Sequence, residues 1–316
     1  MNGWTPVRAR PRDGELSVEW RWLDNAPFRE PFFADTVQLA LERPFTLLFP
    51  RETTIDALAA GDPGLEPNGF IFHMSRCGST LVTQMLAAVP EFLVLSEPLL
   101  VNDVLRAPGT DDERLRRLRL AIAALGRRRS GGERGYVLKL DPWATHDLPL
   151  IRRAFPNTPW LFLSRDPVEV LVSHRRQPGM HMLPTVVPPE LFGTDLTSAA
   201  AMSFEDYGAF VLGAICRQAL AQHDERARFL EYRELPGAMA HVLDWFELDC
   251  DGADRAAMQA ASERDAKNPT HSFTDDTAAK TQAATPELRA AVDRCARPAY
   301  EGCRAISMKS ASPPIS

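Results

Sequence analysis

The sequence predicts an α/β fold with a mainly parallel central sheet and helices on both of its faces. Between residues 66 and 308, short apolar runs of strand length alternate with longer stretches of helical period. The runs are apolar throughout, which is typical of strands whose two faces are both covered by crossover helices. No repeat of fixed period is present, so the sequence excludes a solenoid or a propeller.

The elements can be placed in order along the chain. In residues 1–65, an alternating run at Glu15–Trp22 predicts a strand, and Thr36–Leu41 predicts a short helix. Turns at Gly61–Gly64 and Pro67–Gly69 separate this section from the rest. We therefore expect an N-terminal extension at 1–65 packed on or beside the main domain, an α/β domain at 66–308 and a frayed tail at 309–316.

Strands and helices alternate in the predicted domain. The predicted strands are Phe70–Met74, Phe92–Leu95, Tyr136–Leu140, Trp160–Ser164 and Phe229–Tyr232, and the predicted helices are Ser79–Ala88, Arg114–Leu125, Leu148–Phe155, Val168–Arg176, Ala201–Arg226 and Pro236–Phe246. Residues Gln177–Ala199 interrupt this order with four prolines and two glycines and no sustained period. A connection of this length is either a functional lid or a solvated surface segment.

Composition and charge exclude several classes of protein. The 316 residues are 45% hydrophobic and 25% charged, as in soluble globular chains. No apolar stretch reaches the roughly 18 residues of a membrane-spanning helix, and the first residues lack the apolar core of a secretory signal. We therefore expect a cytoplasmic protein. The 36 basic and 42 acidic residues give a net charge of −6, which argues against general binding to nucleic acid or to an anionic membrane.

The cysteines form neither a disulfide pattern nor a metal-binding pattern. They are odd in number and include no CxxC pair and no spacing to histidine that is typical of zinc sites. We expect free thiols in a reducing compartment and no metal. The five residues are Cys77, Cys216, Cys250, Cys295 and Cys303.

The segment Phe70–Val82 runs from a strand through a turn of small residues into a helix. Backbone N–H groups at a helix start are unpaired and lie at the positive end of the helix dipole, so this architecture favours a bound phosphate. Gly78 permits close approach of the backbone, Cys77 precedes it in the turn, and the hydroxyls of Ser79 and Thr80 add donors. The simpler interpretation is a strand-to-helix turn with a good cap.

The loop departs from that of nucleotide triphosphatases, which reads GxxxxGK[ST]. His73 stands at the first glycine, and no lysine separates Gly78 from Ser79. The cation is Arg76, two residues before Gly78. This arrangement resembles the 5′-phosphosulfate loop of the sulfotransferase family, whose fold is similar to that of P-loop proteins.

A second motif resembles the 3′-phosphate segment of the same family. Arg165 follows the strand Trp160–Ser164, and Ser173 lies eight residues later in the next predicted helix. An arginine can direct two donors at one phosphate, and the serine adds a third. The alternative is an arginine that pairs with a surface carboxylate.

Two weaker correspondences follow. Tyr232 resembles the family's tyrosine that approaches the adenine, although it could equally be a core tyrosine with its hydroxyl paired. Lys267 resembles the basic loop that closes over the 3′-phosphate, but the family's RKG-type signature is absent and a solvated lysine is the alternative. Only four lysines occur in the chain, so Lys139, near the end of an otherwise buried strand, needs an anionic partner or an exit to solvent.

The resemblance implies a reaction and roles for these residues. The donor would be 3′-phosphoadenosine 5′-phosphosulfate (PAPS), no metal is needed, and the acceptor would be a hydroxyl or amine on a small molecule or peptide. Arg76 would stabilise charge on the bridging and leaving oxygens, and Lys139 would lie near the sulfuryl group. Glu97, at the carboxyl end of a strand, resembles the general base of the glutamate-using branch. A capping or surface carboxylate is the alternative.

Several functional questions stay open at this stage. His146 is a rival base to Glu97. The residues His174, Arg175, Arg176 and His181 either guide an acidic acceptor or form a solvated basic stretch. A P-loop kinase or triphosphatase that depends on Mg²⁺, and a non-catalytic protein that binds 3′-phosphoadenosine nucleotides, are the competing functions. The sequence also leaves open whether two copies form a homodimer.

Overall fold

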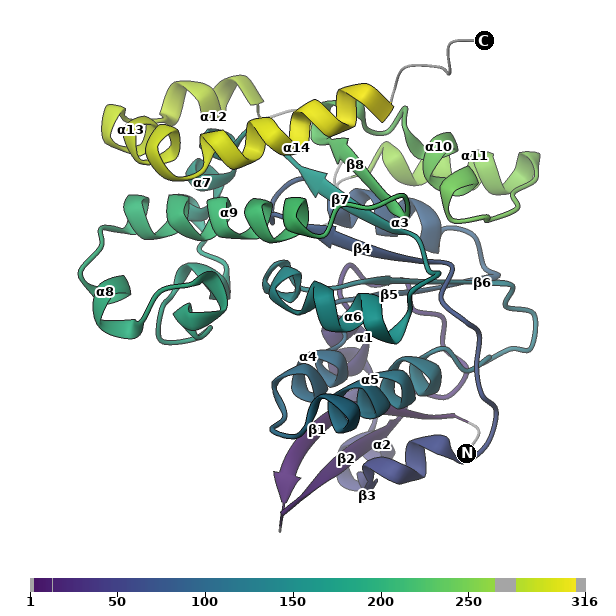
Figure 1. Cartoon of the computed structure of the whole chain (residues 1–316). Helices are drawn as coiled ribbons and strands as arrows, with labels where there is room; N and C mark the ends of the chain where they lie inside the picture. The colour runs from purple at the N-terminus through teal and green to yellow at the C-terminus, as the bar shows by residue number, and fades with distance from the viewer. Residues whose placement is uncertain (1–2, 13, 265–276, 311–316) are drawn as a thin grey trace.

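A five-stranded parallel sheet lies at the centre of the computed structural model, which describes residues 3–12, 14–264 and 277–310 (Figure 1). Its strand order is β5-β6-β4-β7-β8, and all four neighbouring pairs are parallel. The bounds are Gly69–His73 for β4, Phe92–Ser96 for β5, Gly135–Lys139 for β6, Trp160–Ser164 for β7 and Ala227–Glu231 for β8. The predicted α/β class is confirmed, and each predicted strand of the domain is present.

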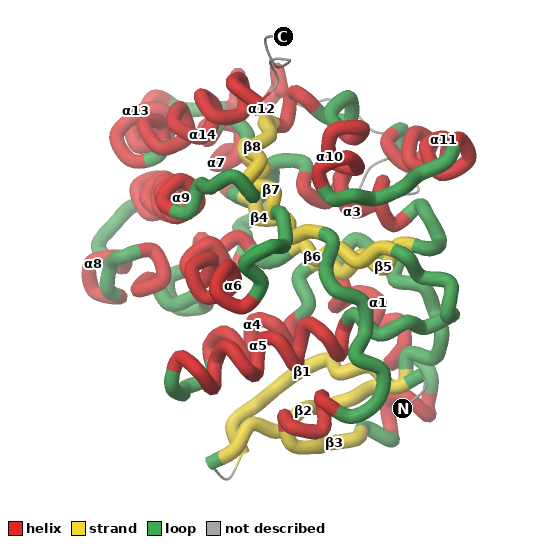
Figure 2. Tube along the Cα trace, turned by 45° about the vertical axis from the view of Figure 1, so that its right-hand side comes forward, coloured by secondary structure: helices red, strands yellow, loops and turns green. Residues whose placement is uncertain are grey.

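The strands are apolar because both faces of the sheet are covered. Every residue of β4, β5, β6 and β7 is buried, whereas the edge strand β8 alternates between buried and more exposed residues. On one face, Phe72 packs against Trp160 and Trp160 against Phe229, with ring centroids 5.8 Å apart in both pairs. Figure 2 shows α6 and α9 on one side of the strands and α3 and α10 on the other.

The helices extend and correct the sequence prediction. The helices α4, α11, α12, α13 and α14 were not predicted, and the predicted helix 201–226 is wrong at both ends, because Ser203 caps α9 and the helix ends at Ala221. The bounds are α3 Ser79–Ala87, α4 Leu99–Arg106, α5 Asp111–Leu125, α6 Leu148–Ala154, α7 Pro167–Arg176, α8 Leu196–Ala200, α9 Phe204–Ala221, α10 Met239–Trp245, α11 Gly252–Ser262, α12 Thr277–Ala283, α13 Pro286–Cys295 and α14 Arg297–Ser310.

The first 65 residues contain a separate antiparallel sheet. Its strands lie side by side in the order β1 (Trp4–Arg12), β2 (Glu15–Trp22) and β3 (Arg51–Thr54). The helices α1 (Phe33–Leu41) and α2 (Pro44–Leu48) connect β2 to β3. Only β2 and part of α1 were predicted. β1 packs against α4 and α5, and the Nε of Arg8 lies 2.7 Å from Oδ2 of Asp103 on α4.

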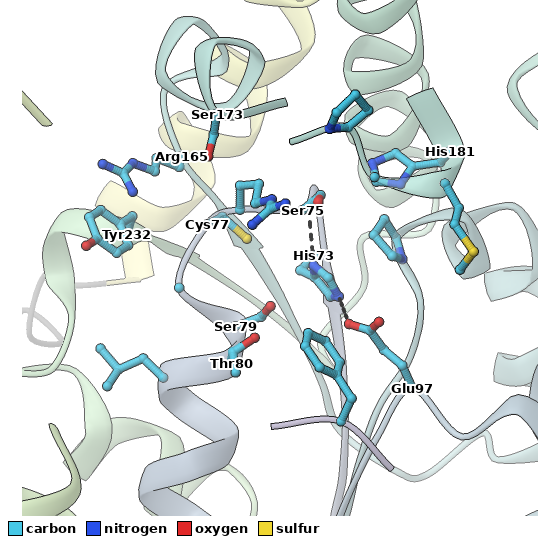
Figure 3. Close-up of a pocket in the computed structure, with 18 of the residues that line it drawn as sticks. His73, Ser75, Cys77, Ser79, Thr80, Glu97, Arg165, Ser173, His181 and Tyr232 are labelled. Atoms are coloured by element: carbon cyan, nitrogen blue, oxygen red, sulfur yellow. Dashed lines mark hydrogen bonds and ion pairs between the residues drawn. The ribbon is translucent and has the colours of Figure 1, made fainter. Parts of the chain in front are cut away.

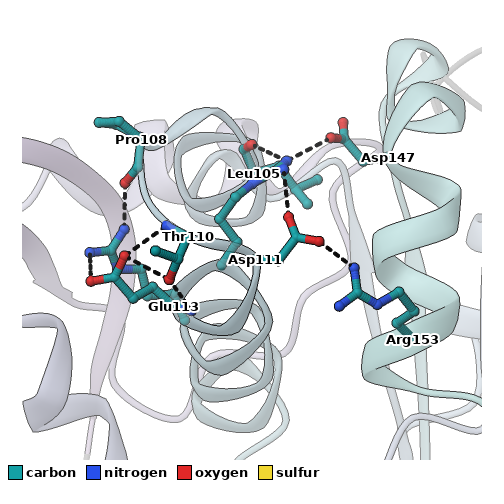
Figure 4. Close-up of polar contacts among 9 residues, drawn as sticks. Leu105, Pro108, Thr110, Asp111, Glu113, Asp147 and Arg153 are labelled. Atoms are coloured by element: carbon teal, nitrogen blue, oxygen red, sulfur yellow. Dashed lines mark hydrogen bonds and ion pairs between the residues drawn. The ribbon is translucent and has the colours of Figure 1, made fainter.

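The helix α5, which lies between the two sheets, is fixed at its N-terminus by a capping box (Figure 4). The backbone N–H of Glu113 donates to Oγ1 of Thr110 at 3.3 Å, and the backbone N–H of Thr110 donates to Oε2 of Glu113 at 2.8 Å. Arg153 on α6 donates to Asp111 at 2.6 Å. The capping box pairs the N–H groups of Thr110 and Glu113, and the Arg153–Asp111 contact holds α5 against α6.

The connection after α7 contains the short 3-10 helices η3 (Met180–Met182) and η4 (Pro189–Phe192) and leads into α8. In the described part of the chain, no helix is both long enough and apolar enough to cross a membrane.

Candidate functional site

The carboxyl ends of the five parallel strands meet at one edge of the sheet, and the candidate site lies there. The strand order arranges the strand ends in a line: Glu97 follows β5, Lys139 ends β6, His73 ends β4, Arg165 follows β7 and Tyr232 follows β8. A cavity of about 490 Å³ opens at this edge. The predicted residues that line it are Arg76, Cys77, Gly78, Ser79, Thr80, Glu97, Arg165, Ser173 and Tyr232.

The loop between β4 and α3 turns sharply in the middle of the cavity. Ser75, Arg76 and Gly78 all have left-handed backbone conformations, with φ of 75°, 50° and 84°. A Cβ at residue 78 would lie 2.7 Å from Cδ2 of Tyr232, so glycine is needed both for the turn and for the approach of the tyrosine ring. The start of α3, with the buried Ser79 and Thr80, consequently faces the cavity.

Two side chains of this loop point to neighbouring backbone carbonyls. The Sγ of Cys77 donates to the carbonyl of Leu163 at 3.2 Å, and burial raises the pKa of the Cys77 thiol to about 12, so this residue stays a thiol. The Nη2 of Arg76 donates to the backbone carbonyl of Gln177 at 3.0 Å and contacts its side-chain oxygen at 3.3 Å. Arg76 therefore ties the β4–α3 loop to the connection after α7.

One half of the cavity, called here the donor half, is formed by Arg165, Ser173 and Tyr232 (Figure 3). Asp166 caps α7 by accepting from the N–H of Val168 at 2.8 Å, which ends the strand and turns the chain at Arg165. The guanidinium of Arg165 stacks over the Tyr232 ring at 3.9 Å.

Glu169, on the first turn of α7, fixes the orientation of the Arg165 guanidinium. Its Oε2 accepts from the Nε of Arg165 at 2.7 Å and lies 2.6 Å from Nη2. Arg165 is only 5% exposed, so its charge is held in a fixed plane beside the cavity.

The other half, called here the reaction half, is lined by Glu97 and His73, and the predicted Lys139 does not line the cavity but is buried behind Glu97 as its ion-pair partner. The Oε1 of Glu97 lies 3.1 Å from Nζ of Lys139 and 3.3 Å from Nε2 of His73. Lys139 is fully buried, and its Nζ also donates to Oγ1 of Thr80 at 3.3 Å. The Nδ1 of His73 accepts from the N–H of Ser75 at 3.1 Å. Since Nδ1 is an acceptor, a neutral His73 carries its proton on Nε2 and presents it to Glu97.

Burial and charge determine the protonation of the reaction half. Burial alone would raise the pKa of Glu97, but the Lys139 ammonium and the hydrogen bond from His73 lower it to about 2, so Glu97 is a carboxylate. Burial lowers the pKa of His73, which keeps this histidine neutral. Asp141 lies beside them, and burial together with the negative charge of Glu97 raises its pKa well above the ordinary value. The half therefore holds one compensated ion pair.

Several lining residues were missed or misinterpreted by the sequence analysis. His73 was noted only as a departure from the triphosphatase loop. The other missed residues belong to no local sequence motif, because they reach the cavity only when segments distant in the sequence pack together. The missed residues are Phe32 from the N-terminal extension, Trp143 from η2 (Pro142–Asp147), Met180, Arg264 and Lys280.

The remaining predicted residues lie in different surroundings. Lys267 lies outside the described residues. His146 is exposed on η2 and does not line the described cavity. Of the stretch interpreted as basic, Arg175 lies 3.4 Å from Glu205, whereas His174 and His181 are buried. Within the part of the chain that the structure describes, no group of three His, Cys, Asp or Glu residues could hold a metal ion.

Scans of protein-family models and of curated proteins give no match to this chain. Similar solved structures exist. A sulfotransferase from Alicyclobacillus acidocaldarius is 16% identical with a TM-score of 0.46, covering 77% of this chain and 96% of its own. A sulfotransferase domain from the curacin biosynthetic pathway is 15% identical with a TM-score of 0.45, covering 73% of this chain and 98% of its own. A mouse sulfotransferase complexed with PAP is 12% identical with a TM-score of 0.39, covering 81% and 92%.

All three are sulfotransferases. The resemblance expected from the two sequence motifs is thus found again among similar folds.

Proposed function

We propose that this protein is a sulfotransferase that transfers a sulfuryl group from PAPS to an acceptor, with Glu97 as the general base. The observation that carries the proposal is the meeting of three groups of residues in one cavity. The phosphate loop lies in its middle, a guanidinium and a serine hydroxyl lie in the donor half, and a buried carboxylate–lysine pair lies in the reaction half.

The donor half supports a nucleotide with phosphates at both ends of its ribose. The N–H groups at the start of α3, with Ser79 and Thr80, suit the 5′-phosphosulfate. Arg165 and Ser173 lie across the loop and suit a 3′-phosphate, and the ring of Tyr232 offers a surface for the adenine. The lysine of a kinase phosphate loop is absent here.

The reaction half supports proton removal and charge stabilisation. The acceptor oxygen or nitrogen forms a bond to sulfur, the bond from sulfur to the 5′-phosphate oxygen breaks, and the acceptor proton passes to Glu97. A carboxylate with a pKa of about 2 is a weak base while Lys139 remains beside it. Of the effects that lower this pKa, the Lys139 charge is the strongest, so movement of the ammonium toward the sulfuryl oxygens raises the basicity of Glu97.

Two further cations adjoin the cavity. Arg264 and the buried Lys280 line it on either side of residues 265–276. Together with Arg76 and Arg165 they make four cations that line the described cavity, against the single carboxylate of Glu97, in a chain whose net charge is −6. This local excess favours a donor that carries several negative charges.

Calorimetry with 3′-phosphoadenosine 5′-phosphate (PAP), AMP and ATP tests the donor. We expect PAP to bind about a hundredfold more tightly than AMP, because the 3′-phosphate gains charge-assisted hydrogen bonds. Arg165→Ala should remove this preference. Arg228→Ala is the matched control, since Arg228 is exposed and stacks on Trp245 at 4.0 Å outside the cavity lining. Equal affinity for PAP and AMP would overturn the proposal, and tighter binding of ATP with Mg²⁺ would favour a kinase.

A Glu97→Gln variant tests the base. It should bind PAP as the wild type does and transfer the sulfuryl group about 10²- to 10⁴-fold more slowly, the range expected for loss of a general base. Unimpaired transfer by this variant would remove Glu97 from the role.

A further inference from the structure

The helices α1 and α2 carry an apolar patch on the surface of the N-terminal part. It consists of large apolar side chains that are between 49% and 67% exposed: Leu39, Phe45, Leu47, Leu48 and Phe49. The rings of Phe45 and Phe49 lie 5.5 Å apart, and α1 packs against α2, so these side chains form one surface, called here the N-terminal patch. None of them lines the described cavity.

Polar contacts with β2 fix the orientation of α2, which lies beside that strand (Figure 1). Thr46 is buried, and its Oγ1 donates to the carbonyl of Trp22 at 2.9 Å. The Nη1 of Arg21 donates to the carbonyls of Thr46 at 3.0 Å and of Leu47 at 3.3 Å. A surface helix usually turns its apolar residues toward the protein. In α2 the buried residue is a threonine, and Leu47 and Leu48 are exposed.

The N-terminal patch is large for a protein that stays monomeric. A large apolar side chain covers about 150–250 Å², so five that are half exposed present about 500 Å². This area lies toward the upper end of the largest patch on a typical monomer. A standard interface takes about 800 Å² from each partner, which the patch and the residues around it can supply.

The charges at the two ends of the patch are balanced. Residues 45–49 are preceded by Glu42 and Arg43 and followed by Arg51 and Glu52. Glu42 and Arg43 are exposed, and neither has an ion-pair partner among the described residues. Equal numbers of both signs give no attraction to an anionic membrane. They do suit a partner whose surface carries the same balanced charges.

The segments of this chain outside the described residues do not suit the role of cover. Residues 1–2 and 13 adjoin the N-terminal sheet and are too few to cover five large side chains. The helix α14, which precedes residues 311–316, lies at the opposite end of the molecule from β1, β2 and β3 in Figures 1 and 2. Arg264 and Lys280, which bound residues 265–276, line the cavity. The cover is therefore sought in another molecule.

We propose that the N-terminal patch is the interface between two copies of this chain related by a two-fold axis. In such a contact the same surface occurs on both sides, so each patch buries the other. Adjacent charges of opposite sign are self-complementary across the axis, because Glu42 of each copy faces Arg43 of the partner subunit. The proposal is independent of the function proposed above.

Light scattering after size-exclusion chromatography measures the oligomeric state of the full chain. We expect a dimer with a dissociation constant of about 1 μM, in the range of interfaces of standard size. The protein is loaded from tenfold below to a hundredfold above this concentration. A monomer at every concentration would overturn the proposal. If that monomer also sedimented with vesicles of phosphatidylcholine and phosphatidylglycerol, the patch would instead be a membrane-binding surface.

A substitution within the patch tests the location of the interface. Leu48 is 67% exposed, so Leu48→Asp should fold normally, which circular dichroism checks. It should weaken dimerisation about a hundredfold, because it places two unpaired charges in one apolar interface. Leu196→Asp is the matched control, since Leu196 is 48% exposed on α8, outside the patch. Dimerisation that survives Leu48→Asp, or that is weakened equally by Leu196→Asp, would contradict the assigned interface.

An exchange of charges tests the two-fold axis. Glu42→Arg and Arg43→Glu each place like charges opposite one another and should each weaken dimerisation about tenfold. The double variant restores opposite charges across the axis and should recover the affinity of the wild type. If the double variant dimerised no better than the single variants, the proposed pairing across the axis would be wrong.

Discussion

The donor half and the reaction half of the cavity differ in how the chain builds them. In the donor half, Arg165 and Ser173 come from one strand–helix unit, and the neighbouring phosphate loop is a second such unit. In the reaction half, His73, Glu97 and Lys139 end three different strands and meet only because the sheet order is β5-β6-β4. Arg165, Ser173 and the β4–α3 loop therefore depend on local sequence, whereas Tyr232, which follows β8, and the whole reaction half depend on strand order.

The two halves also differ in electrostatics. In the donor half, Arg165 is paired with Glu169, but its guanidinium lines the cavity. In the reaction half, a carboxylate and an ammonium are buried together and compensate each other. The difference is therefore one of access, since Arg165 lines the cavity and Lys139 is fully buried. Substitutions should separate the two behaviours.

The largest effect is expected from Lys139→Met, which breaks the buried pair in the reaction half. Removal of one partner of such a pair costs about 3 kcal/mol of unfolding free energy, because the Glu97 charge stays buried. Urea unfolding measures the loss. Lys139→Met combined with Glu97→Gln should lose less than the sum of the two single variants. If Lys139→Met were as stable as the wild type, the buried Lys139–Glu97 pair would not contribute to the free energy of unfolding, and the prediction would be wrong.

A smaller effect is expected from acidification. The folded pKa of His181 is about 3, against 6.5 for an ordinary histidine, so below pH 6.5 the unfolded chain binds a proton that the folded chain does not. Stability contributed by the neutral ring is therefore lost as the pH falls, by about 2 kcal/mol at pH 5 relative to pH 7. Between pH 7 and pH 5, the free energy of unfolding of His181→Phe should therefore fall by about 2 kcal/mol less than that of the wild type. His223→Phe, which replaces an exposed histidine, should follow the wild type, and identical pH profiles for all three proteins would contradict the prediction.

The smallest effect is expected in the donor half. Tyr232→Leu removes the ring under Arg165 and should weaken PAP binding about fivefold, the usual contribution of a cation–π contact. Tyr232→Phe keeps the ring and should bind PAP as the wild type does. Both variants should leave the unfolding profile between pH 5 and pH 7 unchanged, because the titrating histidines lie in the other half. A loss in Tyr232→Phe equal to that in Tyr232→Leu would assign the effect to the hydroxyl.

The dependence on local sequence in one case and on strand order in the other explains which features of the site could be predicted from the sequence. The phosphate loop and the Arg165–Ser173 spacing are local patterns, so they are visible without a structure. Glu97 and Lys139 were identified from their places at strand ends, but their contact depends on β5 and β6 being neighbours. His181 was grouped with basic residues because its burial depends on Trp143 and His174. The strand β1 escaped prediction because Pro6 and Pro11 interrupt it, although Val7 and Ala9 alternate with Arg8 and Arg10.

Phe32 makes the N-terminal part of the chain a component of the cavity in the α/β part. Nζ of Lys139 lies 4.7 Å above the Phe32 ring, and this ring lines the cavity although it belongs to the first 65 residues. The α/β part and the N-terminal part are therefore not interchangeable units. A chain shortened to its parallel sheet would open the reaction half to water, and a graft of this sheet into another protein would need a replacement for that aromatic cover.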